Sequence, residues 1–390
     1  MPHTWRPAEP AQRPAWLKLR SPGRLADPEP NSSLLVPIVR EARLPPRSIV
    51  VSSAKNVVVA VVGATGAVGE VLLRVLEERQ FPVRQLVPLA STRSAGKTIT
   101  FAGEAVEVQV ACPEAFEGVD LVFFAATGGL SKELAPEAVK RGAVVIDKSS
   151  TWRMDEQVPL VVPEINADAL EKHRGIISNP NCTTTGLVMA LEPIRRAAGL
   201  KSVVVTTFQA VSGSGTPGIE ELDAQVKAKV AGEPAPEPTV FASPIAYNAV
   251  PFCGAAMDDG YLDEERKLLD ETRKILGLPK VDVSVTCVRV PIPVGHSGAV
   301  LVETETPLSP EAAREALDAF PGVTVVDDPA TGKFPTPAEV EGSDEVLVGR
   351  VRKDYGSDKL WLWEVSDNLR KGAATNAVQI AEALLERELV

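Results

Sequence analysis

One segment restricts the fold of this chain more than any other: residues 56–79, NVVVAVVGATGAVGEVLLRVLEER. A continuous run of valines predicts a buried strand, and the apolar residues after position 67 have the spacing of an amphipathic helix. Three glycines, Gly63, Gly66 and Gly69, separate the strand from the helix. Glycines in such a turn allow a tight bend, a close approach of the main chain to a pyrophosphate, and close packing of the helix on the strand. The segment therefore predicts the start of a dinucleotide-binding domain.

The strand that follows makes this prediction more specific. The glycine spacing G-x-x-G-x-x-G departs from the more common G-x-G-x-x-G, and a glycine after a strand can also be a simple turn. The next strand, expected at residues 86–90, ends in Ser-Thr-Arg-Ser, where an NAD-specific enzyme usually carries an acidic residue for the ribose 2′-hydroxyl. An arginine among hydroxyls suits a 2′-phosphate, so we expect NADP. The predicted contacts are Gly63, Thr65, Gly66, Ala67, Val68, Gly69, Thr92, Arg93 and Ser94.

Strand and helix patterns alternate from here to about residue 180, with strands expected at 119–126 and 143–147. This alternation predicts an N-terminal α/β domain of the Rossmann type. In the second half, residues 281–294 and 298–306 read as longer strands with alternating apolar positions, which favours an α+β domain with a mixed sheet. A last helix, expected at 373–389, is predicted to pack back on the first domain.

These patterns predict two folded domains and a tail. We expect the dinucleotide-binding domain at 55–181 with 373–390, and the second domain at 182–372. Residues 1–54 are rich in proline and arginine and lack apolar periodicity, so we expect a disordered N-terminal extension. Residues 231–238, AGEPAPEP, predict a stiff surface linker.

Cys182 is the candidate nucleophile. In GIISNPNCTTTGLVMALEPI, a short strand expected at 175–178 is followed by an Asn-Pro-Asn turn and by a helix that begins at the cysteine. Free N–H groups in the first turn of a helix stabilise an anion, so we expect a lowered thiol pKa. A buried structural cysteine is the alternative, but a polar turn with two asparagines does not favour it.

His296 is the candidate proton-transfer partner. The chain has three histidines, of which His3 lies in the tail and His173 at an expected helix end, where a capping role is ordinary. His296 lies in VPIPVGHSGAVLVE with glycines at 295 and 298, which favour an open pocket over a packed core. Together with Cys182 it predicts nucleophile and general acid/base.

Composition excludes several classes of protein. No apolar stretch approaches the ~20 residues of a membrane span. The net charge of −11 without a basic face argues against a nucleic-acid partner. The four cysteines have no CxxC spacing, so we expect neither a metal site nor a disulfide framework, and a reducing cytoplasm fits best.

Over residues 56–390 the chain resembles the aspartate-β-semialdehyde dehydrogenase family. The resemblance is carried, in order, by GATGAVG, STRSAGK, VVPEIN, NPNCTTT, FQAVSGSG, GYLDEERKLLDETRKI, CVRVPIPVGHSG, VGRVRKD and VSDNLRKGAA. It implies reductive dephosphorylation of L-4-aspartyl phosphate by NADPH through a cysteine thioester. The product, L-aspartate 4-semialdehyde, leads to lysine (through diaminopimelate), methionine, threonine and isoleucine. The family further implies a homodimer, with a catalytic and dimerisation domain at 182–372 that is similar to that of glyceraldehyde-3-phosphate dehydrogenase.

The resemblance also implies residue roles. Gln209 would orient the thioester, Arg289 would hold the substrate α-carboxylate and Glu264 the ammonium group. In a regular strand, Arg289 faces the same side as Val281, Val283 and Val285, which is the apolar side. A guanidinium there needs a bound carboxylate or an internal acidic partner. The remaining implied contacts are Arg153, Asn181 and Lys267 to phosphate, and Ser212, Gly213 and Asn368 to the nicotinamide.

Some alternatives remain open. Glu264 and Lys267, three residues apart, can instead form a surface ion pair. In DKSSTWR, Lys148 replaces an expected Asn and Trp152 an expected Phe, which changes the surroundings of the phosphate site. An N-acetyl-γ-glutamyl-phosphate reductase uses similar chemistry, and a catalytically silent NADP-binding regulator would share the fold.

Overall fold

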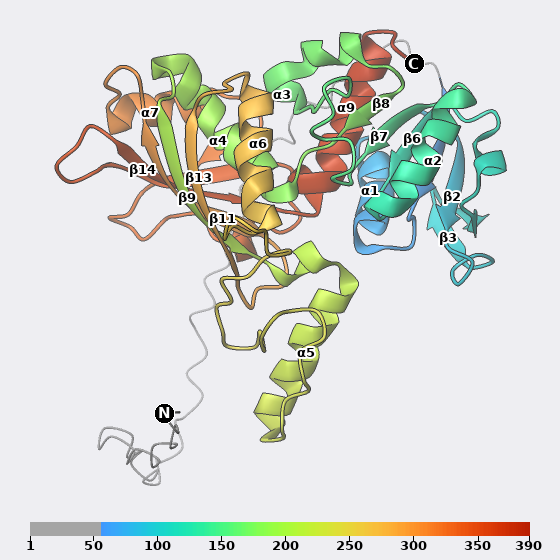
Figure 1. The fold of residues 1–390 in the computed structure, drawn as a ribbon, viewed down its shortest axis with the longest axis horizontal. Helices are drawn as coiled ribbons and strands as arrows, with labels where there is room; N and C mark the ends of the chain where they lie inside the picture. Colours follow the sequence, from blue (N-terminus) through green and yellow to red (C-terminus); the bar gives the residue numbers. More distant parts are fainter. Residues whose placement is uncertain (1–55) are drawn as a thin grey trace, which may run out of the picture. The chain divides into compact units, whose positions relative to one another are not determined.

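The computed structural model describes residues 56–390, so the expected N-terminal extension lies outside the described part of the chain (Figure 1). The first sheet is parallel, with its six strands in the order β5-β2-β1-β6-β7-β8. Its strands are β1 (Val57–Val62), β2 (Val83–Ala90), β5 (Gln109–Val110), β6 (Leu121–Phe124), β7 (Val144–Asp147) and β8 (Ile176–Ser178). A hairpin of β3 (Thr98–Phe101) and β4 (Glu104–Glu107) follows β2.

Both faces of this sheet are covered, which explains the unbroken valine run of β1. Side chains at 57, 59 and 61 pack with α1 (Ala67–Glu78) and α9 (Thr375–Glu386), whereas those at 58, 60 and 62 pack with α2 (Gly128–Lys140). A strand buried on both faces has no polar alternation. The predicted doubly wound α/β domain is confirmed.

The second sheet is mixed, in the order β10-β9-β11-β14-β13-β12, as predicted. Its strands are β9 (Ser202–Gln209), β10 (Asp282–Arg289), β11 (His296–Glu303), β12 (Val323–Val325), β13 (Val346–Lys353) and β14 (Leu360–Ser366). One face packs on α4 (Cys182–Ala198), α6 (Asp263–Leu276) and α7 (Pro310–Asp318). Short helices α3 (Pro163–Asn166) and α8 (Pro337–Val340) complete the connections.

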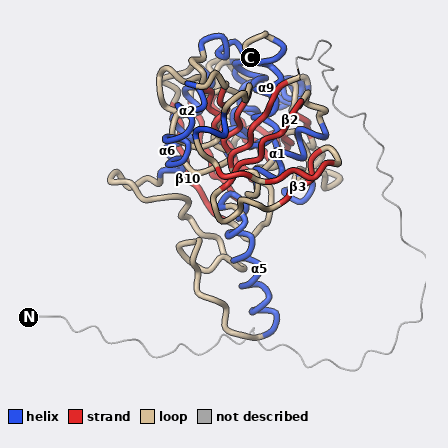
Figure 2. The backbone as a smooth tube through the Cα atoms, turned by 90° about the vertical axis from the view of Figure 1, so that its right-hand side faces the viewer, coloured by secondary structure: helices blue, strands red, loops and turns tan. Residues whose placement is uncertain are grey.

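Several element bounds differ from the prediction, and one helix was not predicted. The expected strand 281–294 ends at Arg289, because prolines at 291 and 293 cannot donate ladder hydrogen bonds, and His296 opens β11. The final helix begins at Thr375 after a buried π-helical turn, Arg370–Ala374, and it packs on the first sheet as expected. Helix α5 (Thr216–Ala231), which no sequence pattern predicted, extends away from both sheets, and the residues 232–238 follow it (Figures 1 and 2).

Candidate active site

The turn between β8 and α4 positions Cys182. Asn181 caps the helix, because its Oδ1 accepts hydrogen bonds from the N–H groups of Thr183 (2.9 Å) and Thr184 (3.2 Å). The N–H of Asn181 donates to Glu271 Oε2 of α6 at 2.7 Å. Cys182 is therefore the first helical residue, as predicted, and its turn is held by a residue 90 positions away.

His296 lies beside the nucleophile. Its Nε2 is 3.4 Å from Cys182 Sγ, and its Nδ1 accepts a hydrogen bond from the N–H of Ala210 at 3.0 Å. An Nδ1 that accepts cannot carry a proton, so the neutral ring is protonated on Nε2, facing the thiol. Burial, and then the charge of Arg289, hold the pKa of His296 well below its usual range. In this geometry His296 is a neutral hydrogen-bond donor to the thiol. This role is narrower than the predicted one, which was transfer of a proton as general acid and base.

The predicted lowering of the thiol pKa is wrong. Burial raises the pKa of Cys182 above its ordinary value, and the carboxylate of Glu264 raises it further. Lys148, Arg289 and Arg153 act in the opposite direction without overcoming these effects. Two N–H groups of the first turn, which were expected to stabilise the anion, are already bonded to the Asn181 cap.

Glu264 of α6 connects several predicted residues. Its Oε1 accepts from Asn181 Nδ2 (2.9 Å) and from Gln209 Nε2 (3.1 Å), and its Oε2 lies 3.3 Å from Lys267 Nζ. Lys267 is also 2.8 Å from Asp263, so the ion pair weighed as an alternative exists. Because the pair lies beside Gln209 and Asn181 and is partly buried, it is part of the site rather than a separate surface feature.

Arg289 has the environment that its strand parity predicted. It is 7% exposed, on the buried side of β10 with Val283 and Val285. Its Nη1 donates to the carbonyl of Ala210 (2.7 Å), and its buried Nε has no hydrogen-bond acceptor. No carboxylate within residues 56–390 forms an ion pair with it. The internal salt bridge weighed as the alternative is absent from the described residues.

Gly213 lies against two of these side chains. A Cβ at Gly213 would come within 2.7 Å of Arg289 Nη1 and 3.3 Å of His296 Nε2. Gly372, in the π-helical turn, is a residue that sequence reasoning missed: a Cβ there would lie 3.0 Å from the Cβ of Cys182. Both glycines therefore allow main chain to approach the site closely.

Arg153 lies behind the turn that holds the nucleophile. Its guanidinium donates to the carbonyls of Asn179 (3.1 Å) and Lys148 (2.5 Å) and to Glu271 (2.9 Å). Its contact with phosphate stays a prediction, and each of its nitrogens already has an acceptor. Trp152, the other departure in this segment, donates its indole N–H to Ser131 Oγ (3.0 Å), which is a bond that phenylalanine cannot make.

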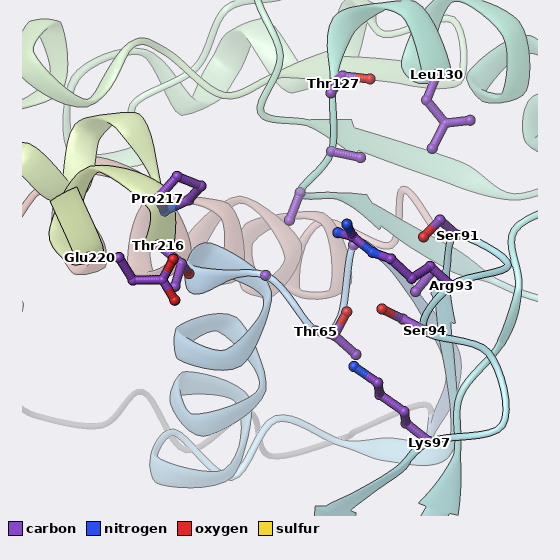
Figure 3. A pocket seen from close by; sticks show the side chains of 15 residues that line it. Thr65, Ser91, Arg93, Ser94, Lys97, Thr127, Leu130, Thr216, Pro217 and Glu220 are labelled. Atoms are coloured by element: carbon purple, nitrogen blue, oxygen red, sulfur yellow. The ribbon is translucent and has the colours of Figure 1, made fainter. Parts of the chain in front are cut away.

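A cavity of about 850 Å³ opens at the glycine turn (Figure 3). Gly63 has a positive φ of 86°, and a Cβ at Gly69 would lie 2.1 Å from the carbonyl oxygen of Gly63. A Cβ at Gly66 would make only an ordinary contact of 3.4 Å, with the carbonyl oxygen of Gly63, and Gly66 lies on the cavity wall. Gly63 thus provides the tight turn and Gly69 the close helix packing, whereas the approach of a pyrophosphate to Gly66 stays a prediction.

Arg93 and Lys97 both point into this cavity (Figure 3). Predicted residues on its wall are Gly63, Thr65, Gly66, Arg93 and Ser94, and the wall also includes Lys97, Thr127, Leu130, Thr216, Pro217 and Glu220. Lys97 was visible in the STRSAGK motif, whereas the α5 residues carry no local signal. Two cations beside a glycine turn fit a dinucleotide with a 2′-phosphate.

Other predicted cofactor contacts lie elsewhere. Ala67, Val68, Gly69 and Thr92 are not on the cavity wall, and neither are Ser212, Gly213 and Asn368. Asn368 Nδ2 donates to Ser212 Oγ (2.9 Å), and Asn368 Oδ1 accepts from the N–H of Gly295 (2.9 Å). These bonds hold the segment that precedes His296. Contact of Ser212, Gly213 and Asn368 with the nicotinamide stays a prediction.

Within 56–390, no three His, Cys, Asp or Glu side chains are grouped as ligands of a metal ion. No helix in this part of the chain has both the length and the apolar character needed to cross a membrane.

Comparison with known proteins identifies the family. Residues 58–173 match the semialdehyde dehydrogenase NAD-binding domain, and residues 191–371 match the semialdehyde dehydrogenase dimerisation domain. Aspartate-semialdehyde dehydrogenase of Aquifex aeolicus is 52% identical over 336 residues, 85% of this chain and 99% of the relative. The Bacillus subtilis enzyme is 49% identical over 341 residues, 85% of this chain and 98% of the relative.

Solved structures agree. The structure of aspartate semialdehyde dehydrogenase II from Vibrio cholerae complexed with ASA has a TM-score of 0.82 and 46% identity, and covers 85% of this chain and 99% of its own. The Candida albicans enzyme with NADP has a TM-score of 0.69 and 26% identity, and covers 86% of this chain and 99% of its own. The chain, with its thiol–imidazole pair and glycine-turn cavity, belongs to the aspartate-semialdehyde dehydrogenase family.

Proposed function

We propose that this protein reduces L-4-aspartyl phosphate to L-aspartate 4-semialdehyde with NADPH, as an enzyme of lysine, methionine, threonine and isoleucine biosynthesis. One observation carries the proposal: Cys182 Sγ and His296 Nε2 are 3.4 Å apart at the start of α4, beside the buried Arg289. A nucleophile, a hydrogen-bond donor and a receptor for a carboxylate are the parts that this acyl transfer and reduction need.

Cys182 reacts as the thiolate, a form that Lys148, Arg289 and Arg153 favour against burial and the charge of Glu264. Its sulfur attacks the acyl carbon of the substrate, the bond to the phosphate oxygen breaks, and a thioester remains on Cys182. NADPH, when bound at the glycine turn, would supply the hydride that reduces this thioester. The resulting tetrahedral adduct then releases the aldehyde and regenerates the thiolate. The cycle begins and ends with the same ionised sulfur, so no net proton transfer to a side chain is required.

His296 supports this cycle as a donor. Its Nε2–H faces Sγ, so it can stabilise the thiolate and then the oxyanion that forms on the acyl carbon. Accepting a proton would give the ring two N–H groups and would set Nδ1–H against the N–H of Ala210. The lowered pKa of His296 opposes the same change.

The substrate is held by both charged groups on its α-carbon. Arg289 presents an unpaired Nε beside a second nitrogen, and parallel N–H donors match a carboxylate. Glu264 supplies the negative charge for the α-ammonium group and lies next to Gln209, which we assign to orienting the thioester. An N-acetylated substrate lacks this positive charge, so the arrangement does not favour the acetyl-glutamyl reaction.

The cofactor binds along the glycine turn. Main chain at Gly63 and Gly66 would hold the pyrophosphate, and Arg93 with Ser94 and Lys97 would hold the 2′-phosphate. We assign residues 55–181 with 373–390 to this domain and 182–372 to catalysis and dimerisation. Because the nucleophile is a free thiol, we place the reaction in the cytoplasm.

We further propose that the protein forms a homodimer through the outer face of the second sheet. On this face Val204 is 43% exposed, and Phe334 is 44% exposed at a groove that Trp361 and Trp363 also line. Exposed apolar side chains beside partly buried tryptophans are typical of an interface between subunits, and Arg350 and Arg352 also line the groove. Val204→Asp should convert the dimer to a monomer in sedimentation velocity, and an unchanged dimer would place the interface elsewhere.

The test of the function is phosphate-dependent formation of NADPH from L-aspartate 4-semialdehyde. Cys182→Ala should lower the rate at least about 100-fold, because no other thiol replaces the nucleophile, while NADP binding persists. Cys112→Ala, at a partly buried cysteine of the first domain, is the matched control and should retain activity. Activity toward N-acetyl-glutamate semialdehyde in place of the aspartyl substrate, or an active Cys182→Ala variant, would contradict the proposal.

A further inference from the structure

Lys148 lies at the edge of the first sheet where the strands end, which is the edge that binds ligands in parallel sheets. It is the first residue after β7, and its backbone N–H donates to the carbonyl of Phe124 (3.1 Å). The neighbouring chain is tied at the same level, because the N–H of Asn179 donates to the carbonyl of Asp147 (2.8 Å). Ligands of parallel sheets bind outside the carboxyl ends of the strands. The main chain therefore holds Lys148 beside the turn that leads to Cys182.

The ammonium group of Lys148 has no partner in the described part of the chain. Its side chain is only partly exposed, yet no carboxylate or hydrogen-bond acceptor within residues 56–390 binds it. The other lysines in this range that are not exposed each have such a partner: Lys267, Lys274, Lys359 and Lys371. A partly buried ammonium group without an acceptor is unfavourable. A bound ligand with an acceptor oxygen would remove this cost.

Lys148 and Cys182 each shift the pKa of the other group. Among the cations that lower the pKa of Cys182, Lys148 has the largest effect, ahead of Arg289 and Arg153, whereas Glu264 raises it. Burial lowers the pKa of Lys148, and Arg153 lowers it further, while Cys182 has the largest raising effect. The nearby carboxylate of Asp147 also raises it, but that carboxylate is hydrogen-bonded to Ser149.

We propose that Lys148 is a substrate-contacting residue, whose ammonium group binds the phosphoryl oxygens of the acyl phosphate and faces the thiolate of Cys182 before the substrate enters. This proposal rests on the function proposed above. The nitrogens of Arg153 already have acceptors, whereas all three N–H bonds of the Lys148 ammonium are free. An ammonium binds phosphate well as a point charge. The lysine at this position thus supplies a charge that the expected asparagine lacks.

Lys148→Asn tests the proposal in the oxidative direction, with inorganic phosphate as substrate. We expect the KM for phosphate to rise roughly tenfold or more, with a KM for the semialdehyde close to that of the wild type. Alkylation of Cys182 by iodoacetamide should also shift to higher pH. Lys172→Asn, at an exposed lysine that ends a 3₁₀ turn, is the control and should change neither quantity. A folded Lys148→Asn variant with an unchanged phosphate KM and an unchanged alkylation profile would overturn the proposal.

A second measurement uses the wild-type protein and does not depend on the stability of a variant. Lys148 and Lys172 are labelled with an amine-reactive reagent, and mass spectrometry follows the labelling with and without inorganic phosphate. Phosphate should slow the labelling of Lys148 at least several-fold and leave Lys172 unaffected. Equal labelling of Lys148 in both conditions would contradict the proposal. A wild type without phosphate-dependent activity would contradict the proposed function instead, while the protection of Lys148 would still report on phosphate binding.

Discussion

The backbone N–H of Ala210 donates a hydrogen bond to His296 Nδ1 at 3.0 Å. This single contact fixes which ring nitrogen carries the proton, because a backbone amide can only donate. The proton therefore sits on Nε2, 3.4 Å from Cys182 Sγ. Since Ala210 follows Gln209 at the end of β9, the strand that presents Gln209 also sets the tautomer of His296.

The first prediction distinguishes a donor from a base at position 296. His296→Ala should lower kcat/KM by about 100- to 1000-fold, the usual cost of removing one oxyanion donor. His296→Gln places an amide N–H near the position of Nε2–H and should recover about tenfold of this loss, as measured in steady-state assays. If the Gln variant were as inactive as the Ala variant, proton transfer by the ring would be essential and the donor role would be wrong.

The sequence predicted the local parts of the site well. Asn181 and Cys182 lie on one continuous strand–turn–helix segment, so their positions followed from the pattern alone. The thiol pKa did not, because its direction depends on burial and on Glu264, which is 82 residues away, and on Lys148 before the turn. Similarly, the bond between Arg153 and Glu271 joins residues 118 apart, and no periodicity indicates such a pair.

In the fold, too, local sequence patterns predicted some elements, whereas others depend on tertiary structure. The valine run and glycines of β1 and α1 predicted the first sheet, because a doubly wound sheet repeats one local unit. Helix α5 escaped prediction because most of its surface is exposed, and it lacks a strong apolar stripe to mark it. Its residues Thr216, Pro217 and Glu220 nevertheless line the cofactor cavity, so tertiary structure alone places them there.

The second prediction concerns cofactor choice. Arg93→Ala should lower the preference for NADPH over NADH about tenfold, because the 2′-phosphate loses a charge-assisted hydrogen bond that NADH never makes. The measurement is the ratio of kcat/KM for the two cofactors. Lys132→Ala, at an exposed lysine of α2 that is not on the cavity wall, should leave the ratio unchanged. A wild type that used both cofactors equally would show that the Arg93 assignment is incorrect.

The third prediction concerns Arg289. Arg289→Lys keeps the charge but loses the planar pair of donors, so kcat/KM for the semialdehyde should fall by about two orders of magnitude, or about 3 kcal/mol. The affinity for NADP, measured by fluorescence titration, should stay the same because Arg289 is not on the cavity wall. A sharply lowered melting temperature with intact kcat/KM would instead assign Arg289 to stability and place the carboxylate elsewhere.

The last prediction concerns Glu364, a carboxylic acid buried behind the nucleophile helix. A Cβ at Gly186 of α4 would lie 3.0 Å from its Oε2, and a Cβ at Gly298 of β11 would lie 2.6 Å from its Oε1. Glu364 is 1% exposed, its Oε2 has no hydrogen-bond partner, and burial raises its pKa to about 8.

The sign of the resulting pH dependence follows from linkage. Between pH 4.5, the ordinary value, and about pH 8, the unfolded chain loses the Glu364 proton and the folded protein keeps it, so stability falls as pH rises. Glu364→Gln has no ionisable group and nearly the same shape. It should be about as stable as the wild type at pH 5 and more stable at pH 8, by up to about 4 kcal/mol. Urea unfolding at the two pH values measures this difference, with Glu133→Gln, at an exposed position of α2, as the control. A stability difference between Glu364→Gln and the wild type that does not change with pH would show that Glu364 titrates alike in the folded and unfolded states.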